Sequence, residues 1–260
     1  MRLGTANVSA TVSLSRGGRL ASLIVHGHEL LITAGDDEAF GWGSFPMVPY
    51  AGRVAKGQFS VDGTQFQLPI TMAPNAIHGT AWTQQWTQIE DNHIRADLGA
   101  DWPLGGHVTQ TFELEDDGLD ITLSVVAGEH QMPAMVGWHP WFRRRLIQDP
   151  TCSAELSFRA ETMYELDDVM IPTGQLIEPS EGPWDSCFAD VSEPLSITWP
   201  GVVKMDLTSS CNHWVIYDRP DHAVCVEPQS DAPDAFNRSP NMLEPGQSLT
   251  ESFRLEWTML

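Results

Sequence analysis

The sequence predicts an all-β protein, and two observations carry that prediction. Apolar and polar residues alternate over several segments, which is the period of a strand with one buried face. The 18 prolines and 21 glycines interrupt the chain so often that few windows can hold a long amphipathic helix. All-β sandwiches or barrels of 260 residues often form one unit, so we expect a single domain over residues 1–260.

Individual strands follow from this alternation in chain order. Residues 8–14 alternate, and Arg16-Gly17-Gly18-Arg19 predicts a turn into a second strand over 20–25. Asp62-Gly63 accepts the positive φ angles of a tight hairpin turn, with Phe59 and Phe66 on the two flanking strands. Two further segments continue the pattern: a hairpin over residues 108–125 that turns at Asp117-Gly118, and a strand over 154–160.

The charge of the chain limits its partners. Lys and Arg total 14 against 35 Asp and Glu, a formal net charge of −21. Such a charge repels nucleic acid and anionic membranes, so a neutral small molecule is the simplest partner. The N-terminal residues lack an apolar stretch of signal-peptide length, and no later run is long enough to span a bilayer, so we expect a cytoplasmic protein.

The four cysteines have no paired spacing of the kind found in zinc or redox motifs, and we expect them to be small core residues. They are Cys152, Cys187, Cys211 and Cys225. The segment 26–29, His-Gly-His-Glu, lies where a hairpin is expected to end and has no third ligand at a recognisable spacing. The sequence therefore predicts no metal site.

Three short motifs, far apart in the chain, each carry a protonatable residue. They are Asn75-Ala76-Ile77-His78-Gly79, Gly137-Trp138-His139-Pro140-Trp141-Phe142 and Val226-Glu227-Pro228-Gln229-Ser230. One carboxylate and two imidazoles are the minimum set for moving a proton from one oxygen to another near neutral pH. The motifs favour an enzyme over a binding module.

These motifs belong to a series of blocks that resembles the aldose 1-epimerases, also called galactose mutarotases. The blocks occur in the family's order and cover nearly the whole chain. They are residues 43–54 with 57–59, residues 75–79, residues 137–142, residues 184–188 and residues 227–237. A His-Gly or Glu-Pro pair alone is common, whereas five blocks in order are a specific signal.

The resemblance implies a particular architecture and activity. The fold would be a large twisted antiparallel β-sandwich, the galactose mutarotase-like supersandwich, with a sugar bound in an open cleft on a concave face. The activity would be interconversion of the α and β anomers of a hexose. A base removes the proton of the C1 hydroxyl, an acid protonates the ring oxygen, and the open aldehyde rotates and closes on its other face. This reaction needs neither a redox cofactor nor a metal.

The resemblance also assigns roles to five residues. Glu227 would be the base and His139 the acid, while Arg53, His78 and Asp185 would bind the sugar. Without the resemblance, each residue has a plainer interpretation. Glu227 would be an exposed loop carboxylate, His139 a satisfied core histidine and Arg53 part of a surface ion pair. His78 and Asp185 would be ordinary turn residues.

Two positions complicate this assignment. Asp190 lies close to Asp185 in the sequence and is easily confused with it. Gly52 precedes Arg53 where many family members have Asn, which puts one neighbouring polar contact in question.

Other functions are compatible with the same motifs. Arg143-Arg144-Arg145 follows the His139 motif, and strand alternation sends Arg143 and Arg145 to one face and Arg144 to the other. If one of these arginines reached the cleft, the site would suit an anionic sugar, such as a hexose 6-phosphate or sulfoquinovose. A catalytically silent carbohydrate-binding protein and a metal-dependent enzyme of the cupin type are further alternatives. We expect a neutral sugar as substrate and a monomer or homodimer.

Overall fold

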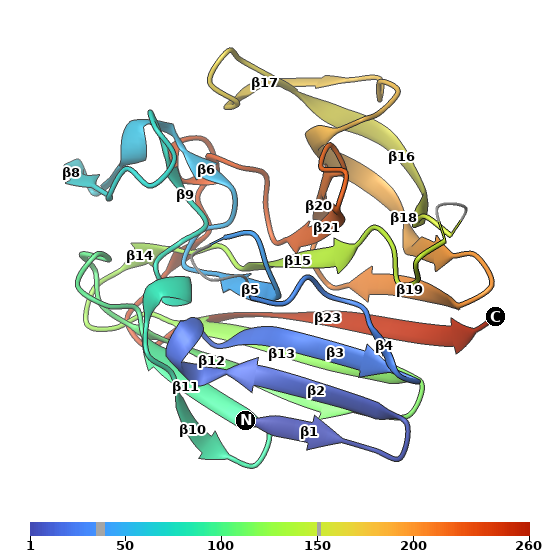
Figure 1. Ribbon diagram of the computed structural model, residues 1–260. Coiled ribbons are helices and arrows are strands. Elements are labelled where there is room, and N and C mark those ends of the chain that lie inside the picture. Colours follow the sequence, from blue (N-terminus) through green and yellow to red (C-terminus); the bar gives the residue numbers. More distant parts are fainter. Residues whose placement is uncertain (35–39, 150–151) are drawn as a thin grey trace.

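The computed structural model describes residues 1–34, 40–149 and 152–260 (Figure 1). Regular structure in these ranges is almost entirely antiparallel β-strand, so the all-β prediction is confirmed. The helical elements are four 3₁₀-helices: η1 (Leu14–Arg16), η2 (Ala55–Gly57), η3 (Ala81–Thr83) and η4 (Ala235–Asn237). No helix in the described ranges has the length and apolar character needed to cross a lipid bilayer.

One series of strands is built around the C-terminal strand β23 (Ser248–Met259). Strand β23 pairs with β13 on one edge and with β19 on the other, and beyond β13 the order continues through β12 and β11 to β10. The bounds are β10 (Thr87–Glu90), β11 (His93–Asp97), β12 (His107–Leu114), β13 (Gly118–Val126) and β19 (Val203–Ser209).

A second series carries two of the residues that the motifs single out, His139 in β15 and Glu227 in β21. Its strands pair in the order β1, β2, β3, β5, β15, β21 and β20, and β4 (His28–Glu29) pairs beside β3. The bounds are β1 (Arg2–Gly4), β2 (Val8–Ser13), β3 (Arg19–Val25), β5 (Ser44–Met47), β15 (Gly137–Arg143), β20 (His213–Tyr217) and β21 (Ala223–Gln229).

The long strand β18 (Asp185–Trp199) belongs to both series. Its first residues, 185–189, pair with β20, and its last residues, 195–199, pair with β19. Strand β16 (Glu155–Leu166) pairs along both parts of β18 and continues into a hairpin with β17 (Pro172–Ile177). In Figure 1 this hairpin rises above β15 and β21, opposite the segment that contains β6 to β9.

The predicted hairpins form where the turn residues allow them. Strands β2 and β3 pair across the turn at residues 16–19, and β12 pairs with β13. Strand β7 (Gln58–Val61) pairs with β8 (Thr64–Gln67), with Phe59 opposite Phe66 and positive φ angles at Asp62 (48°) and Gly63 (78°). Two small sheets complete the fold: β6 (Arg53–Val54) with β9 (Ala76–Ile77), and β14 (Met132–Pro133) with β22 (Met242–Leu243).

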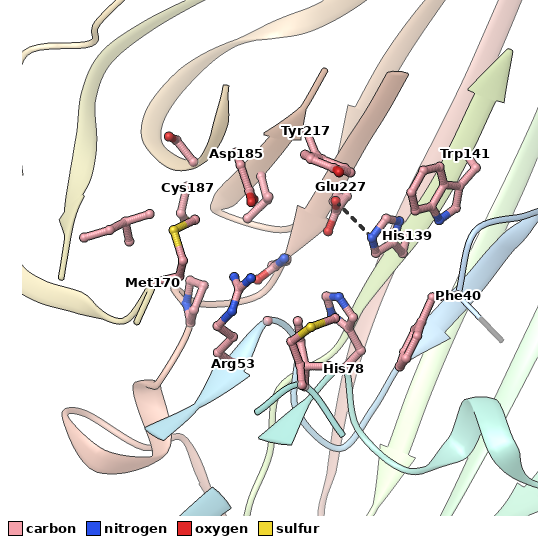
Figure 2. A pocket seen from close by; sticks show the side chains of 18 of the residues that line it. Phe40, Arg53, His78, His139, Trp141, Met170, Asp185, Cys187, Tyr217 and Glu227 are labelled. Atoms are coloured by element: carbon pink, nitrogen blue, oxygen red, sulfur yellow. Dashed lines mark ion pairs between the residues drawn. The ribbon is translucent and has the colours of Figure 1, made fainter. Parts of the chain in front are cut away.

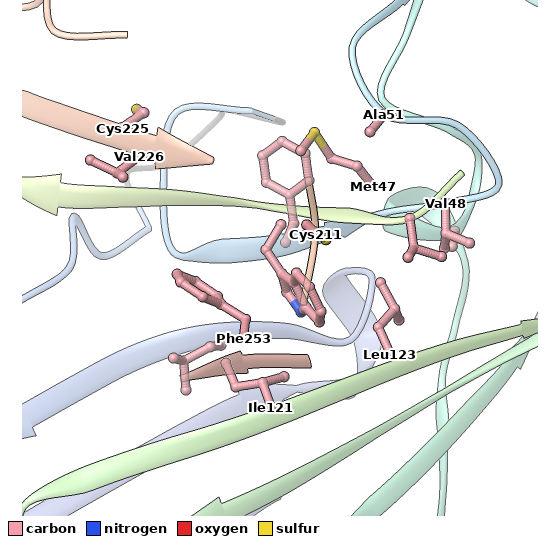
Figure 3. Packing of buried hydrophobic residues seen from close by; sticks show 14 of the residues in the cluster. Met47, Val48, Ala51, Ile121, Leu123, Cys211, Cys225, Val226 and Phe253 are labelled. Carbon is pink, nitrogen blue, oxygen red and sulfur yellow. The ribbon is translucent and has the colours of Figure 1, made fainter. Parts of the chain in front are cut away.

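Strand β15 separates a cleft from the hydrophobic core because successive side chains of a strand point to opposite faces. His139 and Trp141 face the cleft (Figure 2). Trp138 and Phe142 lie on the other face and are fully buried in the core. The Trp138 ring lies 5.6 Å from that of Phe253, so β15 packs directly on β23. Figure 3 shows part of this core, with Phe253 of β23 and Ile121 of β13 below Met47 of β5 and Val226 of β21.

Candidate active site

A cleft of about 400 Å³ opens on the face of β15, β20, β21 and β18 that points away from the core (Figure 2). One wall comes from β6 and β9 and the opposite wall from the β16–β17 loop. The two walls are joined by a hydrogen bond in which Asn75 Nδ2 donates to the Val169 carbonyl at 2.9 Å. All five predicted site residues line this cleft: Arg53, His78, His139, Asp185 and Glu227.

Strand register explains why residues from distant motifs meet on the cleft floor. Val215 of β20 pairs with Cys187 of β18 on one side and with Glu227 of β21 on the other. On the far side of Glu227, His139 of β15 pairs with Phe45 of β5. One row of side chains therefore crosses five neighbouring strands, with Glu227 and His139 at its centre.

Glu227 and His139 form a close, buried pair. Glu227 Oε1 lies 3.3 Å from His139 Nε2, and the two side chains are 2% and 7% exposed. Burial, reinforced by the negative charge of Asp185 and opposed by Arg53, raises the pKa of Glu227 well above its ordinary value. Burial also lowers the pKa of His139 from 6.5 to about 3. Both shifts favour the uncharged forms, a protonated carboxyl at Glu227 and a neutral imidazole at His139.

Two aromatic rings fix the plane of His139. The Phe45 ring stacks on it with centroids 4.9 Å apart, and the Trp141 ring stacks on it at 5.2 Å and an interplanar angle of 7°. The plainer interpretation of His139 was a satisfied core histidine. In the structure the Trp141 ring stacks on the imidazole, Trp138 lies on the opposite face of β15, and His139 faces the cleft.

His78 approaches His139 edge-on, with ring centroids 5.0 Å apart and an interplanar angle of 87°. A left-handed backbone at His78 (φ 64°) and Gly79 (φ 75°) turns the side chain into the cleft. A Cβ at Gly79 would lie 2.1 Å from the Val48 carbonyl oxygen, so only glycine fits there. Burial lowers the pKa of His78 well below its ordinary value, with smaller contributions from His139 and Arg53, so this imidazole is neutral near pH 7.

Arg53 and Asp185 bring opposite charges to the cleft. In the part of the chain that the structure describes, the Arg53 guanidinium makes no ion pair, although its charge opposes the rise in the pKa of Glu227. Asp185 begins β18, opposite Tyr217 in β20. Asp190 is exposed and its Oδ2 accepts a hydrogen bond from Thr162 Oγ1. Asp185 is therefore the aspartate that lines the cleft, and Asp190 does not.

Gly52 marks the departure from the family pattern. Its φ is 63°, and a Cβ there would lie 2.7 Å from Pro233 Cγ. Pro233 itself lines the cleft. A side chain at position 52 would therefore collide with the proline ring.

Sequence reasoning missed several residues that line the cleft. Gln229 follows Glu227 by two positions, so strand alternation alone places it on the same face. Tyr217 and Met170 carried no signal, because they come from a strand and a loop outside the motifs. Among three tryptophans near the motifs, Trp141 lines the cleft. Trp42 lies beneath the Arg19 guanidinium, and Trp82 packs on Phe40, which is itself a lining residue.

None of the three consecutive arginines lines the cleft. Arg143 and Arg145 border a separate surface hollow beside His28, and Arg143 Nε donates to the Leu31 carbonyl. Arg144 points the other way and donates to the carbonyls of Asp218, Pro220 and Ala223. The predicted alternation is confirmed, and these arginines do not reach the cleft.

Among the described residues, one group could hold a metal ion: His139, Cys225 and Glu227, whose donor atoms lie within 4.8 Å of one another. Burial raises the pKa of the Cys225 thiol well above its ordinary value. Metal ligation requires deprotonated donors. A metal at this position would therefore have to displace both the thiol proton and the proton held by the Glu227–His139 pair.

Comparisons with known proteins agree with the fold and the motifs. The sequence model of the family described as "Aldose 1-epimerase" matches residues 1–256. The uncharacterized protein YphB of Escherichia coli (strain K12) is 28% identical over 243 residues, covering 82% of this chain and 83% of its own. The galactose mutarotase of Rattus norvegicus is 29% identical over 142 residues, covering 51% of this chain but only 41% of its own length.

Among solved structures, a galactose mutarotase-like protein from Clostridium acetobutylicum superposes with a TM-score of 0.86 at 19% identity. The superposition covers 100% of this chain and 95% of that one. It supports the β-sandwich fold.

Proposed function

The chain belongs to the aldose 1-epimerase family, and we propose that it is an isomerase that interconverts the α and β anomers of a neutral hexose. The observation that carries this proposal is the buried pair of Glu227 Oε1 and His139 Nε2, 3.3 Å apart on the floor of the cleft. Anomer exchange moves one proton from the C1 hydroxyl to the ring oxygen. A carboxyl and an imidazole that already share a proton are suited to this task.

Glu227 in its ionised form removes the proton from the C1 hydroxyl, and His139 in its protonated form donates a proton to the ring oxygen. The C1–O5 bond breaks and the C1–O1 bond becomes a carbonyl. After rotation about C1–C2, the C5 hydroxyl attacks the other face of the aldehyde. His139 then recovers its proton from that hydroxyl, and Glu227 returns its proton to O1.

The reactive form of the pair differs from the resting form by the position of one proton. The pKa shifts favour protonated Glu227 and neutral His139. Moving this proton along the 3.3 Å contact creates the carboxylate and the imidazolium. A sugar hydroxyl that donates to Glu227 Oε2, which is buried and has no partner in the described chain, would favour the carboxylate.

The charge of the cleft supports a neutral sugar. Arg53 is the one Lys or Arg among the described lining residues, and Asp185 and Glu227 lie with it. Arg143, Arg144 and Arg145 lie elsewhere. A phosphate or sulfonate would meet a single cation in a protein of net charge −21.

Saturation-exchange NMR tests the proposal directly. Irradiating the anomeric proton of one anomer should reduce the signal of the other when the protein is added to a panel of hexoses and pentoses. Glu227→Gln at the same concentration serves as the control for buffer-catalysed exchange. Exchange no faster than in that control, for every sugar and with a folded protein, would contradict the proposal. Ligand broadening without exchange would indicate the non-catalytic sugar-binding alternative.

A further inference from the structure

Gln229 is a buried polar side chain whose amide atoms have no hydrogen-bond partner of normal geometry among the described residues. It is 0% exposed and lines the cleft. In the described chain neither Oε1 nor Nε2 of its amide has a hydrogen-bond partner. Leaving a buried donor or acceptor unpaired lowers the stability of the fold. A side chain with two such atoms beside a proton-transfer pair is therefore expected to have a ligand.

A second buried glutamine, Gln110, has a purely structural role and serves as a comparison. Gln110 is 2% exposed. Its Nε2 donates to the Gly18 carbonyl at 3.0 Å, and its Oε1 accepts from Trp138 Nε1 at 2.9 Å. Gln110 joins layers of the core with both amide atoms paired. Gln229 has the same chemistry and is equally buried, yet neither of its amide atoms has a partner among the residues that the structure describes.

The position of Gln229 indicates which part of a ligand it would meet. It follows Glu227 by two residues on β21, so the two side chains share a face about 6–7 Å apart along the strand. The Gln229 amide lies near the Glu227 carboxyl and lowers its pKa, but makes no hydrogen bond of normal geometry to it. Glu227 Oε2 also lacks a partner. Together they offer two acceptors and one donor group, which complements adjacent hydroxyls.

We propose that Gln229 is a substrate-binding residue that takes the C2 hydroxyl of the sugar, next to the C1 hydroxyl that Glu227 takes. This inference rests on the proposed function. The anomeric carbon has two ring neighbours, the ring oxygen and C2. His139 on β15 donates to the ring oxygen in the proposed reaction, so the ring oxygen lies toward β15. C2 then lies in the other direction, along β21 toward Gln229. A hydroxyl both donates and accepts, and so does an amide.

The test compares Gln229→Met with the matched control Gln110→Met, because methionine keeps the side-chain length and removes both polar atoms. Substrates are galactose and 2-deoxygalactose, or whichever hexose the wild type turns over best with its 2-deoxy analogue. We expect Gln229→Met to lower kcat/KM by roughly 10- to 100-fold on the sugar with a C2 hydroxyl, and to have little effect on the 2-deoxy sugar. The Tm of Gln229→Met should equal or exceed that of the wild type.

Gln110→Met should do the reverse: a lower Tm, with kcat/KM unchanged when measured well below the Tm. If Gln229→Met instead lowers the Tm as Gln110→Met does and keeps its kcat/KM, Gln229 is a structural residue and the inference is wrong. Equal losses on both sugars would overturn the assignment to C2. A wild type without anomer exchange would refute the proposed function, whereas an active wild type with an unaffected Gln229→Met variant refutes only this inference.

Discussion

Glu227 and His139 face each other from the neighbouring antiparallel strands β21 and β15, with Oε1 3.3 Å from Nε2 and both side chains almost fully buried. Neither group can change its charge without affecting the other at this distance. Substitution of either residue is therefore expected to change stability and pH dependence together with activity.

Glu227→Gln should lower kcat by roughly 100-fold or more, because the base of the reaction is lost. The same variant should melt at a higher temperature than the wild type at pH 8, since a neutral amide removes the cost of ionising a buried carboxyl. Anomer-exchange kinetics and calorimetry measure the two effects.

Glu29→Gln is the matched control for Glu227→Gln. The Glu29 carboxylate accepts hydrogen bonds from Ser22 and from the backbone N–H groups of Leu23 and Leu31, away from the cleft. Its loss should lower the Tm and leave kcat unchanged. A Glu227→Gln variant that behaves like Glu29→Gln would remove Glu227 from the mechanism.

His139→Asn should lower kcat by roughly 100-fold or more, and His78→Asn should retain more activity, because His139 contacts Glu227 whereas His78 contacts the His139 ring edge. His213→Asn provides the control: that imidazole bonds Tyr164 Oη at 3.0 Å and is not among the lining residues. Near-wild-type turnover by folded His139→Asn would be incompatible with an imidazole acid at this position.

The stability that His139 and His78 contribute should be lost as the pH drops from about 6.5 toward 3. The pKa of His139 falls to about 3 in the fold and that of His78 falls well below 6.5, so the unfolded chain binds more protons than the folded chain in this window. Glu227 acts in the opposite direction: its pKa is raised, so its contribution to stability is lost as the pH rises above about 4.5.

Thermal melts between pH 4 and 8 separate these contributions. The Tm of a His78→Asn/His139→Asn double variant should rise relative to that of the wild type as the pH is lowered. The Tm of Glu227→Gln should rise relative to that of the wild type as the pH is raised. Differences that do not vary with pH would contradict the assigned shifts.

Neutral hexoses should be turned over with a higher kcat/KM than their 6-phosphates or 6-sulfonates. Arg143→Gln should not change kcat/KM, because Arg143 borders a separate hollow, whereas Arg53→Gln should lower it by roughly 10-fold or more. The comparison is made at low and high salt. A preference for an anionic sugar that weakens with salt and disappears in Arg143→Gln or Arg145→Gln would overturn this assignment.

Gly79→Ala should destabilise the fold far more than Gly63→Ala, although both glycines have a positive φ. A Cβ at Gly63 meets nothing within 4 Å, so that variant should cost only the left-handed backbone penalty of about 1–2 kcal/mol. A Cβ at Gly79 meets the Val48 carbonyl oxygen at 2.1 Å. Urea unfolding gives both values, and equal losses would show that the turn beside His78 tolerates a side chain.

Local features were predicted from the sequence because their causes are local. Asp62 and Gly63 both accept positive φ, so the turn between Phe59 and Phe66 followed from two residues. The same holds for Arg143 and Arg144, whose opposite directions follow from strand alternation. The five site residues came from motifs and the resemblance they carry, and the structure brings all five to one cleft.

Features set by long-range pairing were not predicted. No pattern within β18 indicates that Asp185 pairs toward β20 while Leu195 pairs toward β19. The absence of any partner for the Gln229 amide depends on everything packed around it. Met170 enters the cleft from the β16–β17 loop, whose position over the sheet is fixed by tertiary contacts such as the Asn75 to Val169 hydrogen bond.

The row of side chains from Phe45 through His139, Glu227 and Val215 to Cys187 also bears on how the protein folds. Its members come from chain segments that meet only when strands far apart in sequence have paired, and such non-local pairing is slow because long loops must close first. The Glu227–His139 pair, the proposed catalytic centre, is therefore expected to be assembled late. Recovery of activity after dilution from urea should follow completion of the sheet, which makes turnover a kinetic probe of the final folding step.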